Sequence, residues 1–314
     1  MSLPRGLVAV LAAAVITAAG VVAGTVSGGP SDAPVVEAIE RTTRSTPWTV
    51  VRRIPLQFET YHPQGLARVG DRLFLSSVEV LEAPVRYPEP VDGYDRTPGR
   101  GRGHLFELSL DGRLLRQIEL DEGTVYHPGG IDYDGRSLWV PVAEYRPDSR
   151  AIAYRVDPET LRVREAFRVT DHVGGLVRDR VSGRLHGVSW GSRRFYTWTS
   201  RGRKLAVAPN PEHYVDFQDC AYARFAKAVC TGITEYTGPT GARFELGGIG
   251  VVDLDSAALG AEVPVQTYSA AGHVVTRNPV ELEVDGDTLR MYAAPDDGEE
   301  GAGTELLVLE APVG

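Results

Sequence analysis

Lysine is almost missing from this 314-residue sequence: only Lys204 and Lys227 occur, so arginine carries nearly all of the positive charge. Acidic residues outnumber basic ones, and the formal net charge is −9. Binding to nucleic acid relies on clustered Lys and Arg that meet phosphates. The one basic cluster, at residues 96–102 (RTPGRGR), lies in a Gly/Pro-rich stretch flanked by acids, which is typical of a solvated loop. We therefore expect no nucleic-acid partner.

Cysteine is equally scarce, with Cys220 and Cys230 as the only two. Ten residues apart, they fall on opposite arms of an expected hairpin, where facing side chains lie within disulfide reach. No CxxC pair or activating His accompanies them, so a metal-binding or catalytic thiol is disfavoured. We predict a disulfide, with two buried reduced thiols as the alternative.

The N-terminus predicts export. Arg5 precedes an apolar run over residues 6–26 that ends in small residues, the layout of a secretory signal. The run is also long enough for an uncleaved membrane anchor, or for a buried helix. Residues 27–46 are predicted to be a linker with room for one short helix, and residues 47–314 to be the folded domain. We expect a secreted protein, or one anchored to the outer face of the cytoplasmic membrane, where a disulfide persists.

A repeat of roughly 45 residues organises the rest of the chain. Each unit begins with a polar residue and a few small or polar residues. An apolar strand, a tight turn and a second apolar strand follow, and another hairpin completes the unit. Four strands per unit in series predict an all-β fold, a β-propeller of five four-stranded blades, rather than an open sandwich. The last unit lacks its fourth strand, and residues 49–58 (TVVRRIPLQF) are left over to supply it. The units begin at His62, His127, His172, Asp216 and Asn278.

The repeated pattern, as in HPQGL at residue 62 and HPGGI at residue 127, carries a resemblance. Over residues 48–312 the chain is similar to an uncharacterised actinobacterial family of exported β-propellers, a domain of unknown function. More distantly it resembles gluconolactonase and strictosidine-synthase-like propellers. The lactonase-type enzymes have six blades and a metal held by Glu, Asn and Asp near the channel mouth, whereas this sequence has five units and places His there. The narrower family implies no particular activity.

The repeat places one polar residue at the entry to each innermost strand, so we expect these five side chains to form a ring at one channel mouth. Neutral imidazole and carboxylate groups suit zinc, and carboxylates with waters suit calcium. A divalent cation, calcium or zinc, is therefore a candidate cofactor. The alternative is that each polar residue caps neighbouring backbone groups. The candidate metal ligands are His62, His127, His172, Asp216 and Asn278.

Seven further residues are candidates for ligand binding. Three glutamates coincide at the end of the second strand, which neighbours the start of the first. Two acids replace glycines of the first three units, and a carboxylate there is costly unless it is paired or ligating. Two glutamines lie next to the ring positions. The seven are Glu79, Glu144 and Glu235, Asp219 and Glu281, and Gln64 and Gln218.

Long connections at residues 80–103, 236–247 and 296–303 leave from the same face, where binding residues are commonly found. The GVSWG stretch at residues 187–191 matches the nucleophile elbow of hydrolases, but a strand and not a helix follows it, so we set a nucleophilic Ser189 aside. Two functions remain: a monomeric propeller that binds a small molecule or an extracellular protein or glycan, and a metal-dependent hydrolase of the lactonase or esterase kind. The lack of a recognisable nucleophile favours binding.

Overall fold

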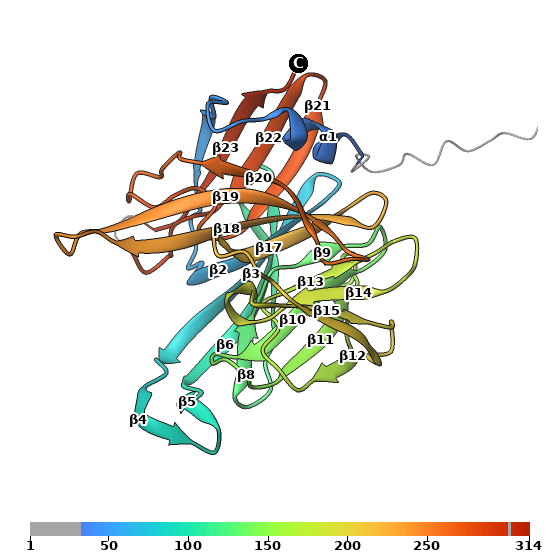
Figure 1. Ribbon diagram of the computed structural model, residues 1–314, viewed down its shortest axis with the longest axis vertical. Helices are drawn as coiled ribbons and strands as arrows, with labels where there is room; N and C mark the ends of the chain where they lie inside the picture. The colour runs from blue at the N-terminus through green and yellow to red at the C-terminus, as the bar shows by residue number, and fades with distance from the viewer. Residues whose placement is uncertain (1–32, 301–302) are drawn as a thin grey trace, which may run out of the picture.

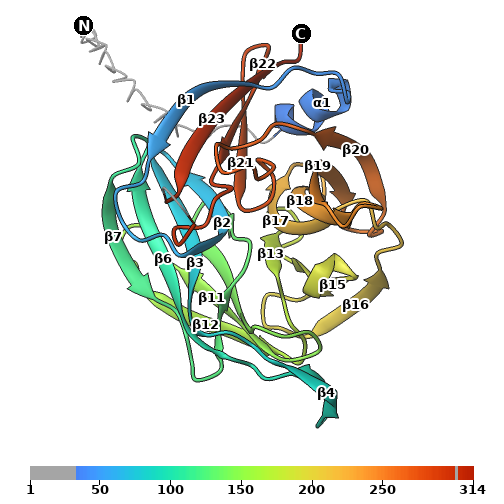
Figure 2. The same ribbon diagram turned by 90° about the vertical axis from the view of Figure 1, so that its left-hand side faces the viewer.

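The computed structural model describes residues 33–300 and 303–314, and the predicted signal or anchor segment at residues 1–26 lies outside them. Five antiparallel sheets, or blades, surround one axis (Figures 1 and 2). Each blade runs from an innermost to an outermost strand, and the sequence prediction of five four-stranded blades is confirmed. Blade 1 contains β2 (His62–Val69), β3 (Arg72–Glu82), β6 (Arg100–Ser109) and β7 (Leu114–Glu119). Blade 2 contains β8 (Val125–Pro128) and β9 (Asp132–Tyr133), then β10 (Leu138–Glu144), β11 (Ala151–Val156) and β12 (Val163–Val169).

Blade 3 contains β13 (Gly175–Arg178), β14 (Leu185–Val188), β15 (Arg194–Trp198) and β16 (Lys204–Pro209). Blade 4 contains β17 (Asp216–Ala223), β18 (Lys227–Thr237), β19 (Arg243–Asp253) and β20 (Leu259–Val265). Blade 5 contains β21 (Val280–Asp285), β22 (Thr288–Ala293), β23 (Glu305–Pro312) and β1 (Thr49–Pro55). A small two-stranded sheet, β4 (Arg86–Val91) with β5 (Tyr94–Arg96), extends from blade 1.

The first strand of the chain closes the ring. β1 pairs antiparallel with the last strand, β23, from Thr49 opposite Glu310 to Pro55 opposite Glu305. Ile54 and Leu56 are buried between blades 5 and 1, in a cluster with Leu306. The sequence prediction that residues 49–58 complete the last blade is confirmed.

Hairpin turns within the blades have the expected chemistry. Gly70, Gly135 and Gly286 adopt φ of 64°, 88° and 59°, a region in which a Cβ atom is strained. These glycines close the turns between the first and second strands of blades 1, 2 and 5, as the sequence predicts.

Glycines also close the middle of the channel. A Cβ atom on Gly65 of blade 1 would lie 2.6 Å from the Ile131 nitrogen, and one on Gly129 would lie 2.2 Å from the Gly174 oxygen. The innermost strands of blades 1, 2 and 3 therefore meet backbone to backbone. The Gly130 N–H donates to the Gly174 oxygen at 2.8 Å, which ties blade 2 to blade 3.

Helix α1 (Ala33–Arg41) lies within the stretch predicted to be a linker. Its apolar side, with Val35, Val36, Ala38 and Ile39, is buried against the strands of blades 4 and 5. Among the described residues, no helix is both long and apolar enough to cross a membrane.

The predicted disulfide is confirmed. Cys220 on β17 and Cys230 on β18 are directly paired in the antiparallel ladder and are bonded to each other. Both are buried between blades 3 and 4.

Candidate functional site

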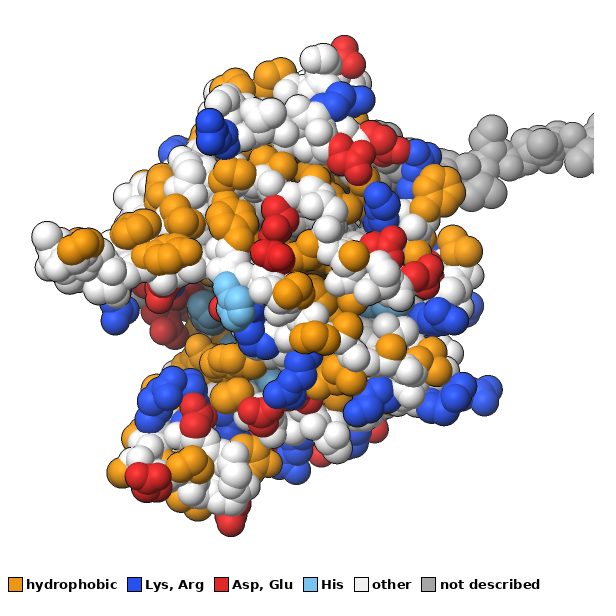
Figure 3. All heavy atoms as spheres, in the orientation of Figure 1, with side chains coloured by type: hydrophobic (Ala, Val, Ile, Leu, Met, Phe, Trp, Pro, Cys, Tyr) orange, Lys and Arg blue, Asp and Glu red, His pale blue; other side chains and the backbone are white. Residues whose placement is uncertain are grey.

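One mouth of the channel lies where the innermost strands begin. Two projections flank it: the β4–β5 sheet of blade 1 and the long β18–β19 hairpin of blade 4 (Figure 1). A hollow separates these projections, with imidazole and carboxylate groups inside it (Figure 3). The long connections predicted at residues 80–103 and 236–247 supply both projections. We call this hollow the mouth site.

Three histidines form a row across the mouth site. The ring centroids of His62 and His127 lie 6.4 Å apart, and those of His127 and His172 lie 5.9 Å apart. They come from blades 1, 2 and 3, because each occupies the same position of its repeat. The repeat alignment therefore predicted this convergence correctly.

His127 occupies the middle of the row and is only 5% exposed. The Tyr145 ring packs against it with a centroid separation of 4.1 Å. Neither Nδ1 nor Nε2 of His127 has a hydrogen-bond partner among the described residues. Burial, together with the neighbouring His172 and His62, lowers the pKa of His127 well below its usual value, so the ring is neutral. A neutral imidazole has one donor and one acceptor nitrogen, and here both are unused.

His172 is held in one orientation. Its Nδ1–H donates to the backbone oxygen of Glu144 at 2.9 Å, which leaves the Nε2 lone pair as an acceptor. Burial lowers the pKa of His172 to about 4. The rings of His172 and Trp190 pack edge to face with a centroid distance of 4.9 Å. The mouth site therefore contains a second neutral imidazole.

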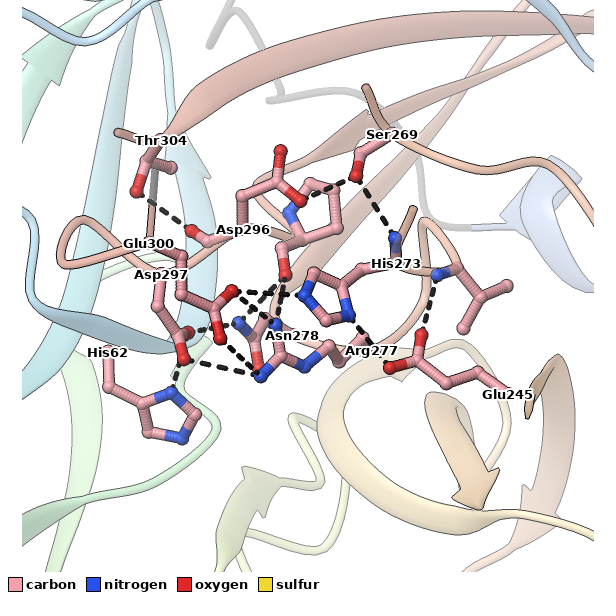
Figure 4. Close-up of polar contacts among 12 residues, drawn as sticks. His62, Glu245, Ser269, His273, Arg277, Asn278, Asp296, Asp297, Glu300 and Thr304 are labelled. Carbon is pink, nitrogen blue, oxygen red and sulfur yellow. Dashed lines mark hydrogen bonds and ion pairs between the residues drawn. The ribbon is translucent and has the colours of Figure 1, made fainter. Parts of the chain in front are cut away.

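His62 belongs to a different environment. Its Nδ1 lies 2.7 Å from Oδ1 of Asp297 (Figure 4). Its Nε2 lies 2.7 Å from Nε2 of Gln64. A carboxylate only accepts and an amide nitrogen only donates, so Nδ1 carries the proton and Nε2 accepts. Burial raises the pKa of Asp297, but the His62 hydrogen bond and the Arg277 charge outweigh it and leave that pKa lowered.

A polar network supports Asp297 from blade 5. Asn278 donates its side-chain amide to Asp297 at 3.0 Å, and Arg277 pairs with Asp297 at 3.2 Å and Glu300 at 3.1 Å (Figure 4). His273 bridges Glu300 and Glu245. Asn278 thus joins the ring as predicted. Sequence reasoning missed Arg277 and Asp297, although Arg277 precedes Asn278 and Asp297 lies in a predicted long loop.

Aromatic and arginine side chains cover the histidine row. The rings of Tyr145 and Trp190 lie 5.8 Å apart, and the Arg96 guanidinium sits 5.1 Å from the Trp190 centroid. Arg146 lies 3.5 Å from the centroid of Tyr94 and donates to the Arg96 oxygen at 3.4 Å. The β4–β5 projection is thereby held against blades 2 and 3. Burial and the Asp297 charge raise the pKa of Tyr145, and Arg96 and Arg277 oppose them.

Arginine and carboxylate side chains pair with each other around the mouth site. Asp216, the ring residue of blade 4, accepts from Arg193 at 2.8 Å, and burial raises its pKa. Every arginine of the site faces at least one carboxylate. The pairs are Arg96 with Asp95, Arg146 with Glu144, Arg193 with Asp216, and Arg277 with Asp297.

The three predicted glutamates do not converge on the mouth site. The Glu144 side chain is 1% exposed and is bound by Arg146 and Arg150, because a bulge between Ala143 and Glu144 shifts its register. Glu79 pairs with Arg102 at the base of the β4–β5 projection, at 3.2 Å. Glu235 is exposed on the β18–β19 hairpin. Glu144 contributes its backbone oxygen to the site, and not its carboxylate.

The two acids at glycine positions also lie outside the mouth site. Asp219 is 2% exposed at the channel centre, where its carboxylate accepts from the backbone N–H groups of Leu66 at 2.8 Å and Ile131 at 3.1 Å. We therefore assign Asp219 to the closure of the ring. Glu281 lines a cavity at the opposite end of the channel.

The two predicted glutamines lie beside ring residues. Gln64 is buried and donates to His62. Gln218 donates to the backbone oxygen of Asp216 at 3.4 Å.

The described residues contain no group of three or more His, Cys, Asp or Glu side chains that could hold a metal ion. The calcium or zinc ion therefore stays a prediction, which elemental analysis of the purified protein would test. Ser189 precedes a short 3₁₀ turn (Trp190–Ser192) and then β15, with no following α-helix. Its hydroxyl accepts from the Arg194 N–H at 3.0 Å, in agreement with setting the nucleophile motif aside.

Comparisons with known proteins show a family. The family described as "Family of unknown function (DUF6454)" matches residues 30–311. The sequence matches no curated protein. Among solved structures, MPT-4, a mannose phosphorylase from Leishmania mexicana in complex with phosphate ion, is 12% identical with a TM-score of 0.48, covering 83% of this chain and 88% of that chain.

Two further solved structures resemble the chain. A luciferin-regenerating enzyme is 11% identical with a TM-score of 0.45, covering 85% of this chain and 95% of that chain. Hydrazine synthase from Kuenenia stuttgartiensis is 14% identical with a TM-score of 0.35 over 55% of this chain, and the match spans 44% of the length of that chain.

Proposed function

The chain belongs to this family of unknown function (DUF6454), and we propose a function for it from the geometry of the mouth site. The protein binds a small, uncharged polar molecule there. The observation that carries this proposal is the His127 ring, which is buried with two unused hydrogen-bonding nitrogens. A buried polar atom without a partner costs about 1–3 kcal/mol. A bound molecule that moves the Tyr145 ring aside and pairs with both nitrogens would recover that free energy.

The charge of the ligand follows from the surroundings. His127 and His172 are neutral because burial lowers the pKa of both. The arginines nearby are already paired with carboxylates, so an anionic ligand would find no unpaired cation. The carboxylates of Asp297, Glu300 and Glu245 are held by arginine or histidine, so a cationic ligand would find no unpaired anion there. An uncharged molecule with hydroxyl or carbonyl groups meets the free donor and acceptor atoms instead.

The hydrogen-bonding pattern narrows the ligand further. His172 offers an acceptor at Nε2, and His127 offers one donor and one acceptor. The ligand therefore needs at least one O–H or N–H group next to an acceptor oxygen. Polyols, monosaccharides and hydroxylactones have this pattern.

Fluorescence and thermal-shift titrations with a panel of these three compound classes test the proposal. Trp190 lies 4.9 Å from His172, so its emission reports on occupancy, and a Trp190→Phe variant identifies its share of the signal. Replacing His127 with Phe keeps a ring but removes both nitrogens. We expect this change to raise the Kd about tenfold or more, the value of one or two hydrogen bonds.

His186 provides the matched control. It is also buried, at 6% exposed, with a pKa lowered to about 4 by burial, but it lies on β14 in blade 3 and contacts Thr197. His186→Phe is expected to leave the Kd unchanged. Equal loss of binding in both variants, or no binding by any compound class, contradicts the proposal.

A second function, hydrolysis of a lactone or ester, is supported by the His62–Asp297 pair. Asp297 fixes the His62 tautomer with the lone pair on Nε2, as a general base requires. Once Gln64 releases Nε2, His62 would take a proton from a water that attacks the substrate carbonyl. The tetrahedral intermediate then expels the alkoxide, which takes that proton and leaves as the alcohol.

Hydrolysis of dihydrocoumarin and 4-nitrophenyl acetate tests this second function. His62→Gln is expected to lower kcat by about 10²–10⁴, the usual contribution of a general base. Asp297→Asn should lower kcat and displace the pH dependence of kcat, because the His62 tautomer is no longer fixed. Turnover that survives His62→Gln would exclude this role.

The location of the protein is also a proposal. The Cys220–Cys230 disulfide and the apolar N-terminal sequence both support a place outside the cytoplasm. Fractionation of producing cells, with the mass of the mature N-terminus, distinguishes a cleaved signal from an anchor. Recovery from the cytoplasm with two free thiols would contradict export.

A further inference from the structure

A second cavity, of about 370 Å³, lies at the opposite end of the channel from the mouth site. Its volume falls within the range of small-molecule sites. The far ends of the innermost strands β2 and β17, strand β9 and the first residues of β21 contribute to its walls, together with β18 and Val35 of α1. We call it the base cavity.

Half of the residues that line the base cavity are aliphatic. Small side chains from blades 1, 2, 4 and 5 supply most of the apolar surface, and the rings of Tyr133 and Tyr222 add to it. The aliphatic residues include Ala67, Val69, Ile131, Ala221, Val229 and Val280.

The charged groups of the base cavity have partners within the protein. Arg68 pairs with Glu283. Asp132 accepts from the backbone N–H groups of Arg178 at 2.9 Å and Tyr222 at 3.1 Å. Arg180 donates to the Tyr133 oxygen at 2.7 Å. Glu281 also interacts with neighbouring groups. An uncharged occupant therefore suits this cavity.

Thr231 supplies a feature that the protein itself does not use. Its side chain lines the base cavity, it is 3% exposed, and its hydroxyl has no hydrogen-bond partner among the described residues. Thr231 lies on β18 opposite Asp219, two residues from the wall residue Val229. A buried hydroxyl on a residue of the cavity wall can donate one hydrogen bond and accept others.

The base cavity is separate from the mouth site. Between them, the backbones around Gly65 and Gly130 are in contact, and the Asp219 carboxylate bonds to Leu66 and Ile131. A molecule at one end therefore cannot pass through the channel to the other.

We propose that the base cavity is a second binding site, which takes a small, uncharged molecule with an apolar body and one hydroxyl, carbonyl or amine group. The apolar body packs on the aliphatic walls, and its polar group hydrogen-bonds to the Thr231 hydroxyl. This ligand differs in class from the polar molecule proposed for the mouth site.

Fluorescence titration of the whole protein with 1-aminoanthracene tests the proposal. This uncharged probe has an apolar body and one amine, and its emission rises in apolar surroundings. Saturable binding to one site is expected. Thr231→Val removes the hydroxyl at constant shape and should raise the Kd about tenfold, the value of one hydrogen bond. Ala221→Leu, at a partly exposed wall position, should abolish binding by filling the cavity.

Three controls make the result specific. Thr231→Val should not lower Tm, because its hydroxyl has no partner to lose. Thr276→Val should lower Tm and leave the probe Kd unchanged, because the buried Thr276 hydroxyl donates to the Gly232 oxygen at 2.8 Å and does not line the cavity. His127→Phe should also leave the probe Kd unchanged. No saturable binding, or binding that both Thr231→Val and Ala221→Leu leave intact, overturns the proposal.

Discussion

The carboxylate of Asp219 on β17 accepts a hydrogen bond of 2.8 Å from the backbone N–H of Leu66 on β2, 153 residues earlier in the chain. The same carboxylate accepts from the Ile131 N–H in blade 2. One side chain of blade 4 therefore ties blades 1 and 2 across the channel, where the glycines of the first three blades leave room for it.

Removing this carboxylate should destabilise the whole ring. We expect Asp219→Ala to lower the free energy of unfolding by about 3–5 kcal/mol, because several buried N–H groups lose their acceptor. Asp219→Asn keeps one oxygen and should lose less. Urea unfolding followed by circular dichroism measures both changes, and Asp121→Ala, at an exposed position, serves as the control. A midpoint for Asp219→Ala equal to that of the control would exclude the tie.

Stability should fall as the pH drops below about 6.5 because of His172. Burial lowers its pKa from 6.5 to about 4 in the folded protein, so the unfolded chain binds more protons between these values. The contribution of His172 is complete above pH 6.5 and is lost as the pH falls towards 4. It amounts to about 3 kcal/mol over that window.

Asp219 works in the opposite direction, because burial raises its pKa and its contribution is lost as the pH rises. Asp219 contributes equally to the pH dependence of the unfolding free energy in the wild type and in His172→Gln. The difference between the slopes of these two proteins therefore reports on His172 alone. We expect the variant to have the shallower dependence of unfolding free energy on pH between 7 and 4.5. Parallel slopes would mean that His172 is not held neutral.

Tyr145 should protect His127 from reagents. Its ring packs 4.1 Å from the His127 ring, between that ring and Trp190. Diethyl pyrocarbonate modifies neutral imidazoles, and mass spectrometry of peptides locates the modified residues. We expect His127 to react slowly in the wild type and several-fold faster in Tyr145→Ala.

The exposed His213 provides an internal standard for this footprint, and the buried His186 should stay unreactive in both proteins. If His127 reacts as fast as His213 in the wild type, Tyr145 does not cover it.

The disulfide should be complete and stabilising. Intact mass after alkylation without reductant is expected to show no modified cysteine, since the two cysteines are bonded to each other. Closing this short loop should contribute about 2–3 kcal/mol. Reductant should therefore lower the Tm of the wild type but not of the Cys220→Ala/Cys230→Ala double variant. Alkylation of the unreduced protein would contradict the bond.

The repeat in the sequence was sufficient to place the histidine row. His62, His127 and His172 occupy one position of three matching units, and in a closed ring equivalent positions lie at one height on one face. The same reasoning assigned the leftover residues 49–58 to blade 5, since the last unit lacked a strand. Both results depend on spacing along the chain, which a sequence shows directly.

The spacing of the repeat does not show in which direction an individual side chain points. A strand alternates its side chains between two faces, and a single bulge reverses that alternation. Bulges occur between Pro63 and Gly65, between Ala143 and Glu144, and between Phe217 and Asp219. Glu144 consequently turns to Arg146 and Arg150, although its position in the repeat predicted a place at the mouth.

The sequence by itself determined the five-bladed ring, its closing strand, the disulfide and the three imidazoles at one mouth, because each follows from regular spacing. Only the tertiary structure decided that Asp219 closes the channel, that Asp297 orients His62, and that Tyr145 covers a His127 ring with two unused nitrogens. The Asp219 and Asp297 contacts join residues from different blades. Their geometry depends on how closely the backbones approach at the glycines, which no local pattern in the chain records.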